Sequence, residues 1–166
     1  MTKVHSELNI QARTCGSCTL CCFTHKVQPR EGESFQKDEA TWCQYCTQGQ
    51  GCSVYATRPT ACQEFLCGWL VGLGTIEDRP DKTHVVMHRF RLGERTFMVK
   101  MVESAPGAIQ ASGVQSVIQD RIRKKDLVAL HYLDTKIELW AHRDVGVPLR
   151  IQIECMDMNI PIKRVE

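Results

Sequence analysis

The sequence predicts an α+β protein: a cysteine-rich N-terminal half with short helices, followed by a small antiparallel sheet with one helix. Two observations predict this fold. Nine of the ten cysteines fall between positions 15 and 67, and most of this region lacks a hydrophobic period, which indicates loops and short turns. Beyond residue 80, short segments alternate apolar and polar residues, as half-buried strands do. We therefore predict two units, residues 1–76 and residues 77–166.

The second unit is expected to hold most of the regular structure. A hairpin should turn at Leu92-Gly93-Glu94-Arg95, and a helix should bury apolar residues three and four positions apart. The expected elements are strands over residues 84–90 and 96–102, a helix over 113–125, strands over 127–132 and 136–141, and an edge strand over 149–154.

The first unit is expected to be mostly irregular. Residues 1–12 could contain a short helix over Leu8 and Ile10. A longer helix is expected from Pro59, because proline suits the first helical turn. Its apolar face would hold Ala61, Phe65, Leu66, Trp69 and Leu70, and Gly72 and Gly74 would end it.

Composition excludes several classes of protein. Hydrophobic residues make up 43% and charged residues 24% of the 166 residues, as in ordinary globular proteins. The net charge of +2 is too small to indicate binding to nucleic acid or to a membrane surface. The N-terminal residues have no apolar signal-peptide core, and the apolar stretch 65–73 is too short to span a bilayer. We expect a soluble, cytoplasmic protein.

The cysteine spacing indicates metal chemistry. Cys15, Cys18 and Cys21 form two successive C-x2-C pairs, and Cys43 and Cys46 form a third. Two cysteines three positions apart on a turn can direct both sulfur atoms at one ion, as in zinc knuckles and iron–sulfur loops. In a reducing cytoplasm such a cluster is expected to hold metal, and not to form disulfides or pack as free thiols. Metal would then hold the N-terminal half together.

The vicinal pair Cys21-Cys22 is a separate case. Neighbouring side chains diverge, so one of the two thiols is expected to serve a second ion, a second iron, or no metal. Cys62 and Cys67 are five residues apart and lie imperfectly on one helical face. Nine thiols suffice for two four-thiolate sites with one spare, or for one such cluster with the remainder in supporting roles.

The order of these residues resembles a known family. The pattern is Cys15-x2-Cys18-x2-Cys21-Cys22, then Cys43-x8-Cys52-x2-Tyr55-x2-Arg58-Pro59-x2-Cys62-x2-Phe65-x-Cys67. It resembles the CxxCxxCC cysteine-cluster proteins, called YkgJ-like, which are described as zinc- or iron-chelating or as containing an iron–sulfur cluster. The resemblance implies zinc or iron, including a 4Fe–4S cluster, as cofactor. It also implies metal-site positions at Cys15, Cys18, Cys21, Cys22, Cys43, Cys52, Cys62 and Cys67. Cys46 is additional to the pattern, which leaves the choice between Cys43 and Cys46 open.

The remaining candidates are expected to have lesser roles. His25 is interpreted as a loop residue, and His84, His88 and Cys155 as residues that do no chemistry. Arg13, Lys26 and Arg58 are candidate counter-charges for the thiolates. The aromatic residues among the cysteines are expected either to shield the sulfur atoms from water or to pack as ordinary core. They are Trp42, Tyr45, Tyr55, Phe65 and Trp69.

Three functions fit this sequence. The first is a cytoplasmic metal-binding protein that holds zinc or iron through clustered thiolates. The second is a redox or transferase enzyme that depends on an iron–sulfur cluster or metal ion. The third is an adaptor folded by structural zinc, whose second unit binds a protein partner. No Ser–His–Asp, P-loop, HExxH or dinucleotide motif is present.

Overall fold

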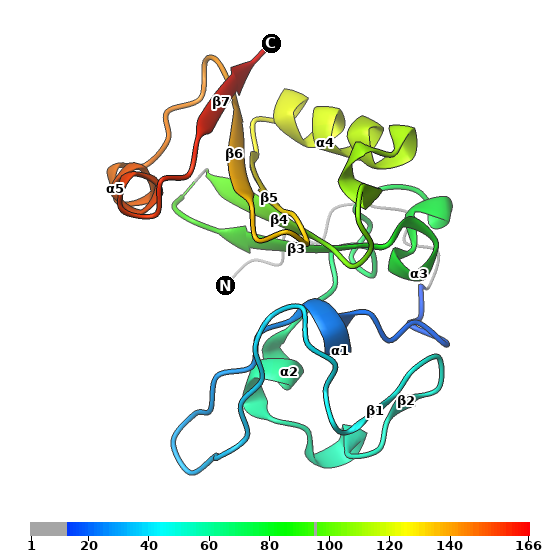
Figure 1. Cartoon of the computed structure of the whole chain (residues 1–166). Coiled ribbons are helices and arrows are strands. Elements are labelled where there is room, and N and C mark those ends of the chain that lie inside the picture. Colours follow the sequence, from blue (N-terminus) through cyan, green and yellow to red (C-terminus); the bar gives the residue numbers. More distant parts are fainter. Residues whose placement is uncertain (1–12, 95) are drawn as a thin grey trace, which may run out of the picture.

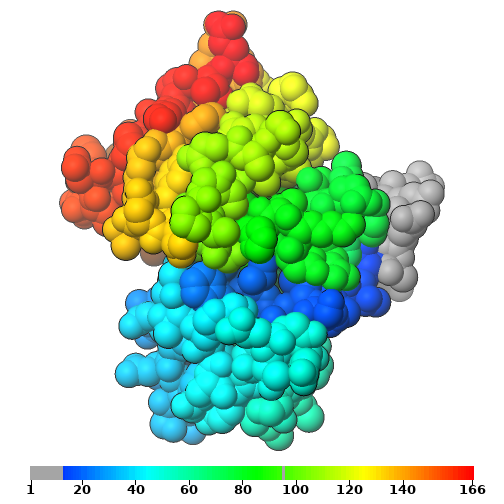
Figure 2. All heavy atoms as spheres, turned by 45° about the vertical axis from the view of Figure 1, so that its right-hand side comes forward, coloured from blue at the N-terminus to red at the C-terminus, as the bar shows by residue number. Residues whose placement is uncertain are grey.

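The computed structural model describes residues 13–94 and 96–166. The expected helix over Leu8 and Ile10 lies outside these residues. The described part of the chain folds into a five-stranded sheet above a smaller, mostly irregular N-terminal part (Figure 1). The space-filling view shows the same division, with the blue and cyan N-terminal residues gathered beneath the sheet and its helices (Figure 2).

The five-stranded sheet follows the chain order β3-β4-β5-β6-β7. Its strands are β3 (Val85–Arg91), β4 (Phe97–Glu103), β5 (Leu127–His131), β6 (Ile137–His142) and β7 (Ile162–Val165). The predicted hairpin over 84–102 and the predicted strands near 127 and 137 are confirmed. β5 is buried on both faces from Leu127 to Leu130, so its sequence is a continuous apolar run and not an alternating one.

The sheet is mixed, so the prediction of an antiparallel sheet is wrong. β4 pairs in parallel with β5, and β6 pairs in parallel with β7. Parallel neighbours need a long crossover, and each pair has a helix in its connection. The helices are α4 (Ser112–Arg123), close to the predicted 113–125, and α5 (Leu149–Asp157).

The segment predicted as an edge strand over 149–154 is helical. The residues from Leu149 alternate in polarity, but Ile151 and Cys155 are four apart and pack on the sheet in the second core cluster. Pro148 precedes the helix and sets the backbone angle at its start. The edge strand at this side of the sheet is β7 instead.

The helix predicted from Pro59 is also shorter than expected, because α2 covers only Thr60–Glu64. The chain then turns to pair with β3: the Gly68 N–H donates to the Met87 carbonyl at 2.6 Å. A Cβ at position 68 would lie 2.6 Å from the Leu73 Cδ1 and 3.1 Å from that oxygen, so a larger residue would force a local shift. Trp69 and Leu73 therefore enter the core beside the sheet.

Two hydrophobic cores cover the two faces of the sheet. α4 and the residues around Trp69 pack on one face, and α5 packs on the other (Figure 1). The fully buried side chains of Met101, Ile118 and Leu130 mark the first core. The division at residue 76 stays a prediction, although Trp69 and Leu73 pack with the second unit.

The N-terminal part has little regular structure. Its elements are α1 (Cys21–Thr24), β1 (Cys46–Thr47), β2 (Gly51–Cys52), the 3-10 turn η1 (Tyr55–Thr57) and α2. Within residues 13–66, Val27 is the one buried hydrophobic side chain. The described chain is completed by η2 (Ile76–Asp78), α3 (Pro80–Thr83) and η3 (Ala108–Gln110).

Candidate metal centre

Four thiols face one small cavity. Cys15, Cys18, Cys21 and Cys67 line a space of about 20 Å³, together with Trp69, Leu70, Arg79, Pro80 and Val86. We call these four cysteines the first thiol group. Three of them come from one short segment, and the fourth comes from the edge of the sheet, so the group joins the N-terminal part to β3.

Local backbone structure explains how the first thiol group assembles. The Cys18 N–H donates to the Cys15 carbonyl at 2.9 Å, which closes a turn through Gly16 at a φ of +53°. Cys21 then begins α1. On the opposite side, Cys67 forms an isolated antiparallel bridge with His88 of β3. The sheet edge thus fixes the position of the fourth thiol.

Five further thiols lie together on the other side of α1. The Cys43 N–H donates to the Cys22 carbonyl at 3.0 Å, and the Cys46 N–H donates to the Cys43 carbonyl at 3.0 Å. Cys52 lies directly opposite Cys46 in the β1–β2 pair, and Cys62 is close enough to Cys43 and Cys52 to interact electrostatically with both. Cys22, Cys43, Cys46, Cys52 and Cys62 are the second thiol group.

Cys21 and Cys22 meet where the two groups adjoin. The Cys22 thiol donates a hydrogen bond to the Cys21 sulfur, which lowers the pKa of Cys21 to about 7. The same hydrogen bond, followed by burial, raises the pKa of Cys22 far above its usual range. A shared proton on the vicinal pair therefore favours one thiolate at neutral pH.

Burial acts on most other thiols. It raises the pKa of Cys15, Cys18, Cys46 and Cys62. It raises the pKa of Cys67 to about 11. Because a metal ligand must be a thiolate, any ion that binds these sulfur atoms has to displace protons.

Three cations lie close to the thiols, and the sequence pointed to only one of them. Arg58 partly opposes the burial that raises the pKa of Cys62, and it stacks on Tyr55, with the guanidinium carbon 4.1 Å from the ring centroid. Arg79 partly opposes the burial that raises the pKa of Cys15, and it contacts the Ser17 hydroxyl at 3.3 Å. Arg79 is 64 residues from Cys15 in the chain, so no local pattern could have indicated it.

Lys37 is the third cation, and it is almost fully buried. Its ammonium donates to the carbonyls of Phe23, Asp38 and Thr41 at 3.0, 2.7 and 2.9 Å. Burial lowers the pKa of Lys37, whereas the nearby thiols Cys43, Cys22 and Cys62 oppose this effect. The buried side chain fixes a cation beside the second thiol group.

The other two predicted counter-charges have different partners. Arg13 donates to the carbonyls of Trp69, Leu73 and Gly74 at 2.8, 3.3 and 3.1 Å, and so holds the turn after Cys67. Lys26 forms an exposed ion pair with Asp38 at 3.5 Å.

The histidine candidates pack against aromatic rings. The ring centroids of His25 and Phe65 are 4.5 Å apart, and those of Phe65 and His88 are 5.1 Å apart. The His25 Nε2 lies 3.2 Å from the Ala61 carbonyl oxygen. Burial lowers the pKa of both histidines. Cys155 belongs to α5 and is buried in the second core.

Neither thiol group is a closed coordination shell as it lies. Across residues 13–94 and 96–166, no set of three or more His, Cys, Asp or Glu side chains is arranged so that it could hold a metal ion. No cysteine in this part of the chain is in a disulfide. The nine thiols are free, and the described side chains do not hold four of them round one ion.

Comparison with known proteins adds no family. No family model, curated protein or solved structure matches this chain. The likeness to the CxxCxxCC proteins therefore depends on the spacing of the cysteines and of the Tyr-x2-Arg-Pro block. None of the described helices is long and apolar enough to cross a membrane.

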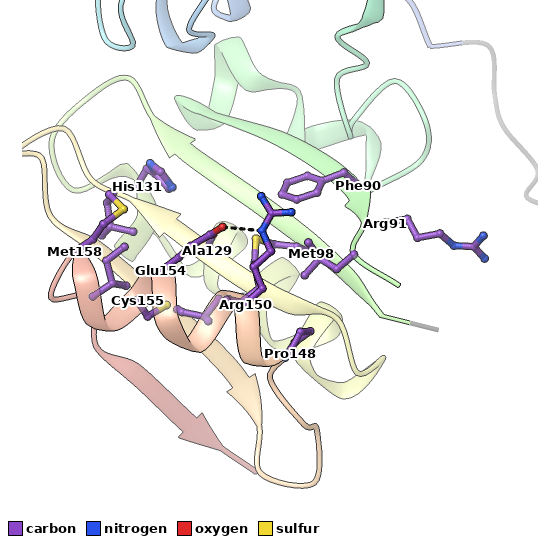
Figure 3. A pocket seen from close by; sticks show the side chains of 15 residues that line it. Phe90, Arg91, Met98, Ala129, His131, Pro148, Arg150, Glu154, Cys155 and Met158 are labelled. Carbon is purple, nitrogen blue, oxygen red and sulfur yellow. Dashed lines mark hydrogen bonds and ion pairs between the residues drawn. The ribbon is translucent and has the colours of Figure 1, made fainter. Parts of the chain in front are cut away.

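A larger cavity, of about 470 Å³, lies between α5 and the sheet. Figure 3 shows its labelled side chains, with Phe90 and Met98 from the sheet opposite Cys155 and Met158 near α5. The Arg150–Glu154 ion pair, at 3.1 Å, lies along the helix at this cavity. No local sequence pattern indicated this cavity, because its lining depends on α5 being a helix.

Proposed function

We propose that this chain is a metal-binding protein that holds zinc or iron through two groups of cysteine thiolates. The observation that carries the proposal is the contrast within residues 13–66. This segment is ordered around one buried hydrophobic side chain, Val27, yet it contains eight of the nine clustered thiols. A segment without a hydrophobic core needs cross-links to stay folded.

The energies support metal as the source of those cross-links. Burial of one valine contributes about 1.5–3 kcal/mol, whereas fixing the backbone costs about 1–2 kcal/mol for every residue. A structural zinc site in a small peptide contributes about 10–16 kcal/mol at neutral pH. Disulfides could act in the same way, but a reducing cytoplasm would keep the thiols free for metal.

The donor set favours zinc or iron. Both groups offer sulfur atoms, and soft thiolate ligands suit zinc and iron–sulfur clusters better than magnesium or calcium. The first thiol group would supply Cys15, Cys18, Cys21 and Cys67. The second would supply four of its five thiols, which leaves the choice between Cys43 and Cys46 open. A bound ion would cross-link distant segments of the chain and would stabilise the thiolate form of its ligands.

Cations beside the thiols support the same proposal. A site with four thiolates and one divalent ion has a net negative charge, and burying it requires compensation. Lys37 and Arg58 lie near the second group, and Arg79 lies near the first. The resemblance of the cysteine spacing to the YkgJ-like proteins adds independent support, and a cytoplasmic location would keep the thiols reduced.

Anaerobic purification followed by metal analysis and an absorption spectrum tests the proposal. We expect close to two equivalents of zinc per chain, or iron with visible absorption from sulfur-to-iron charge transfer. Less than one equivalent of any transition metal would contradict the proposal.

A further inference from the structure

The β1–β2 pair places two thiols of the second group directly opposite each other. Cys46 and Cys52 are register partners in this antiparallel pair. The neighbouring Ser53 N–H donates to the Tyr45 carbonyl at 2.8 Å, so Tyr45 and Ser53 form a hydrogen-bonded pair. Because the two kinds of pair alternate along an antiparallel ladder, Cys46 and Cys52 form a non-hydrogen-bonded pair.

This geometry suits a disulfide. In a non-hydrogen-bonded pair the Cα atoms are about 4.5 Å apart and the side chains lie on one face, closer than in the other kind of pair. A disulfide joins Cα atoms that are about 4.4–6.8 Å apart. The turn between the two strands is closed by the Gln50 N–H on the Thr47 carbonyl at 2.9 Å. The bond could therefore form without rearranging the backbone.

The hairpin is also accessible to a small oxidant. Residues 47–50 are exposed, and Cys46 and Cys52 are half-buried. The Cys22 thiol also lies within hydrogen-bond distance of Cys46, so Cys22–Cys46 is the competing pairing. Cys46 and Cys52, however, are register partners of a strand pair, which holds their side chains on one face.

We propose that Cys46 and Cys52 are a site of reversible oxidation by hydroperoxides. One thiol loses its proton and the resulting thiolate attacks hydrogen peroxide, which breaks the O–O bond and gives a sulfenic acid and a hydroxide. The hydroxide takes up the thiol's proton and leaves as water. The second thiol attacks that sulfur, which forms the S–S bond and releases a second water. Two thiols and one hydrogen peroxide thus give one disulfide and two waters, and a dithiol reductant reverses the change.

The consequence for metal binding rests on the proposed function. The disulfide would remove two of the five thiols of the second group and leave Cys22, Cys43 and Cys62, one fewer than a four-thiolate site needs. The first group would keep all four of its thiols. Oxidation would therefore release metal from the second group only.

Peptide mapping of the full-length protein tests the pairing. The protein is treated with a few equivalents of hydrogen peroxide, alkylated with a maleimide and digested with chymotrypsin, which cleaves after aromatic residues. Cleavage after Tyr45 and Tyr55 releases residues 46–55, which contain Cys46 and Cys52 and no other cysteine. We expect this peptide to be two hydrogens lighter than the dithiol and free of maleimide. A cross-link to another peptide, or two maleimides on this one, would overturn the proposal.

Variants separate this inference from the proposed function. Cys52→Ser should abolish the lighter peptide, and Cys155→Ala, which changes a cysteine of the second core, should leave it unchanged. Metal content is measured on the same samples before and after peroxide. A Cys46–Cys52 disulfide in a protein that binds no metal would defeat the proposed function and leave this inference standing. Metal binding together with a disulfide between other cysteines would support the proposed function and overturn this inference.

Discussion

Cys21 and Cys22 are consecutive residues of α1, yet they belong to different thiol groups. Cys21 lines the small cavity with Cys15, Cys18 and Cys67, whereas the Cys22 carbonyl accepts a hydrogen bond from Cys43 at 3.0 Å. The two thiols are joined by a hydrogen bond, so the pair lies at the border of the two groups, where each sulfur atom can serve a different site. The two thiol groups thus adjoin at α1.

Single substitutions at this pair should affect different ions. We expect Cys21→Ser to lose about one equivalent of metal from the first thiol group, and Cys22→Ser to lose about one equivalent from the second, because each removes a thiolate that a four-coordinate site requires. Cys155→Ala should keep the full metal content and cost about 1 kcal/mol in packing. Metal analysis of the three purified variants measures their metal content. Metal loss in Cys155→Ala would show that metal binding depends on packing in the second core.

Removing metal should loosen one part of the chain and spare the other. Strong chelation, or Cys18→Ser, should make residues 13–66 sensitive to protease because they have one buried hydrophobic side chain. Residues 80–154 should stay protected by the two cores on the sheet. Limited proteolysis followed by mass spectrometry measures the protease sensitivity of both regions in one experiment. Equal resistance of the two regions after chelation would be incompatible with metal as the main support of residues 13–66.

The buried ammonium of Lys37 should matter for the second thiol group. Replacement by methionine leaves three carbonyls without a donor and removes a nearby cation, at a cost of about 1–3 kcal/mol in stability. We expect Lys37→Met to weaken metal retention by the second group and not by the first. Lys37→Arg, which keeps the charge, should restore part of this retention. Competition with a chelator measures both variants, and equal metal loss from both groups would point to general unfolding.

Acid should weaken the contact between the N-terminal part and the sheet through Glu39. Burial alone would raise the pKa of Glu39, but hydrogen bonds from His131 and from Lys100, the latter at 2.8 Å, lower it to about 2. A carboxyl whose folded pKa is depressed contributes stability above its unfolded pKa, and this contribution is lost as pH falls toward the folded value. The loss should therefore occur between about pH 4.5 and pH 2.

The matched variant for this test is Glu39→Gln. It should cost about 1–3 kcal/mol at neutral pH, because it weakens hydrogen bonds to a charged group. It should also flatten the acid dependence in that pH range. Denaturant unfolding at several pH values measures both effects, and an unchanged acid dependence in the variant would exclude Glu39 as the cause.

The sequence correctly predicted those elements whose hydrophobic pattern fits only one kind of secondary structure. Val114, Val117, Ile118 and Ile122 repeat at helical spacing, and they pack inward from α4. The strands β3 and β4 alternate clearly enough to fix their pairing as a hairpin. Residues 149–154 were assigned wrongly because Leu149, Ile151 and Ile153 alternate, while Ile151 and Cys155 also satisfy helical spacing. Packing against the sheet selects the helical conformation of this segment. A local sequence pattern does not show such tertiary contacts.

The candidate site was accessible to sequence reasoning only in part. Spacing predicted that the cysteines matter, because C-x2-C is a local pattern. It did not predict that Cys67 joins Cys15, since that depends on the bridge between Cys67 and β3. Lys37 and Arg79 were missed for the same reason. Their proximity to thiols follows from the fold.

A titration of the reduced, metal-free protein with Co²⁺ under anaerobic conditions tests the central claim most directly. Cobalt bound by several thiolates absorbs strongly through sulfur-to-metal charge transfer, so the signal reports the ligands as well as the ion. The proposed binding of metal by two thiol groups predicts that this absorption rises to saturation at two equivalents, and at one equivalent in Cys18→Ser. Absence of the absorption, or saturation below one equivalent in the unmodified chain, would contradict it.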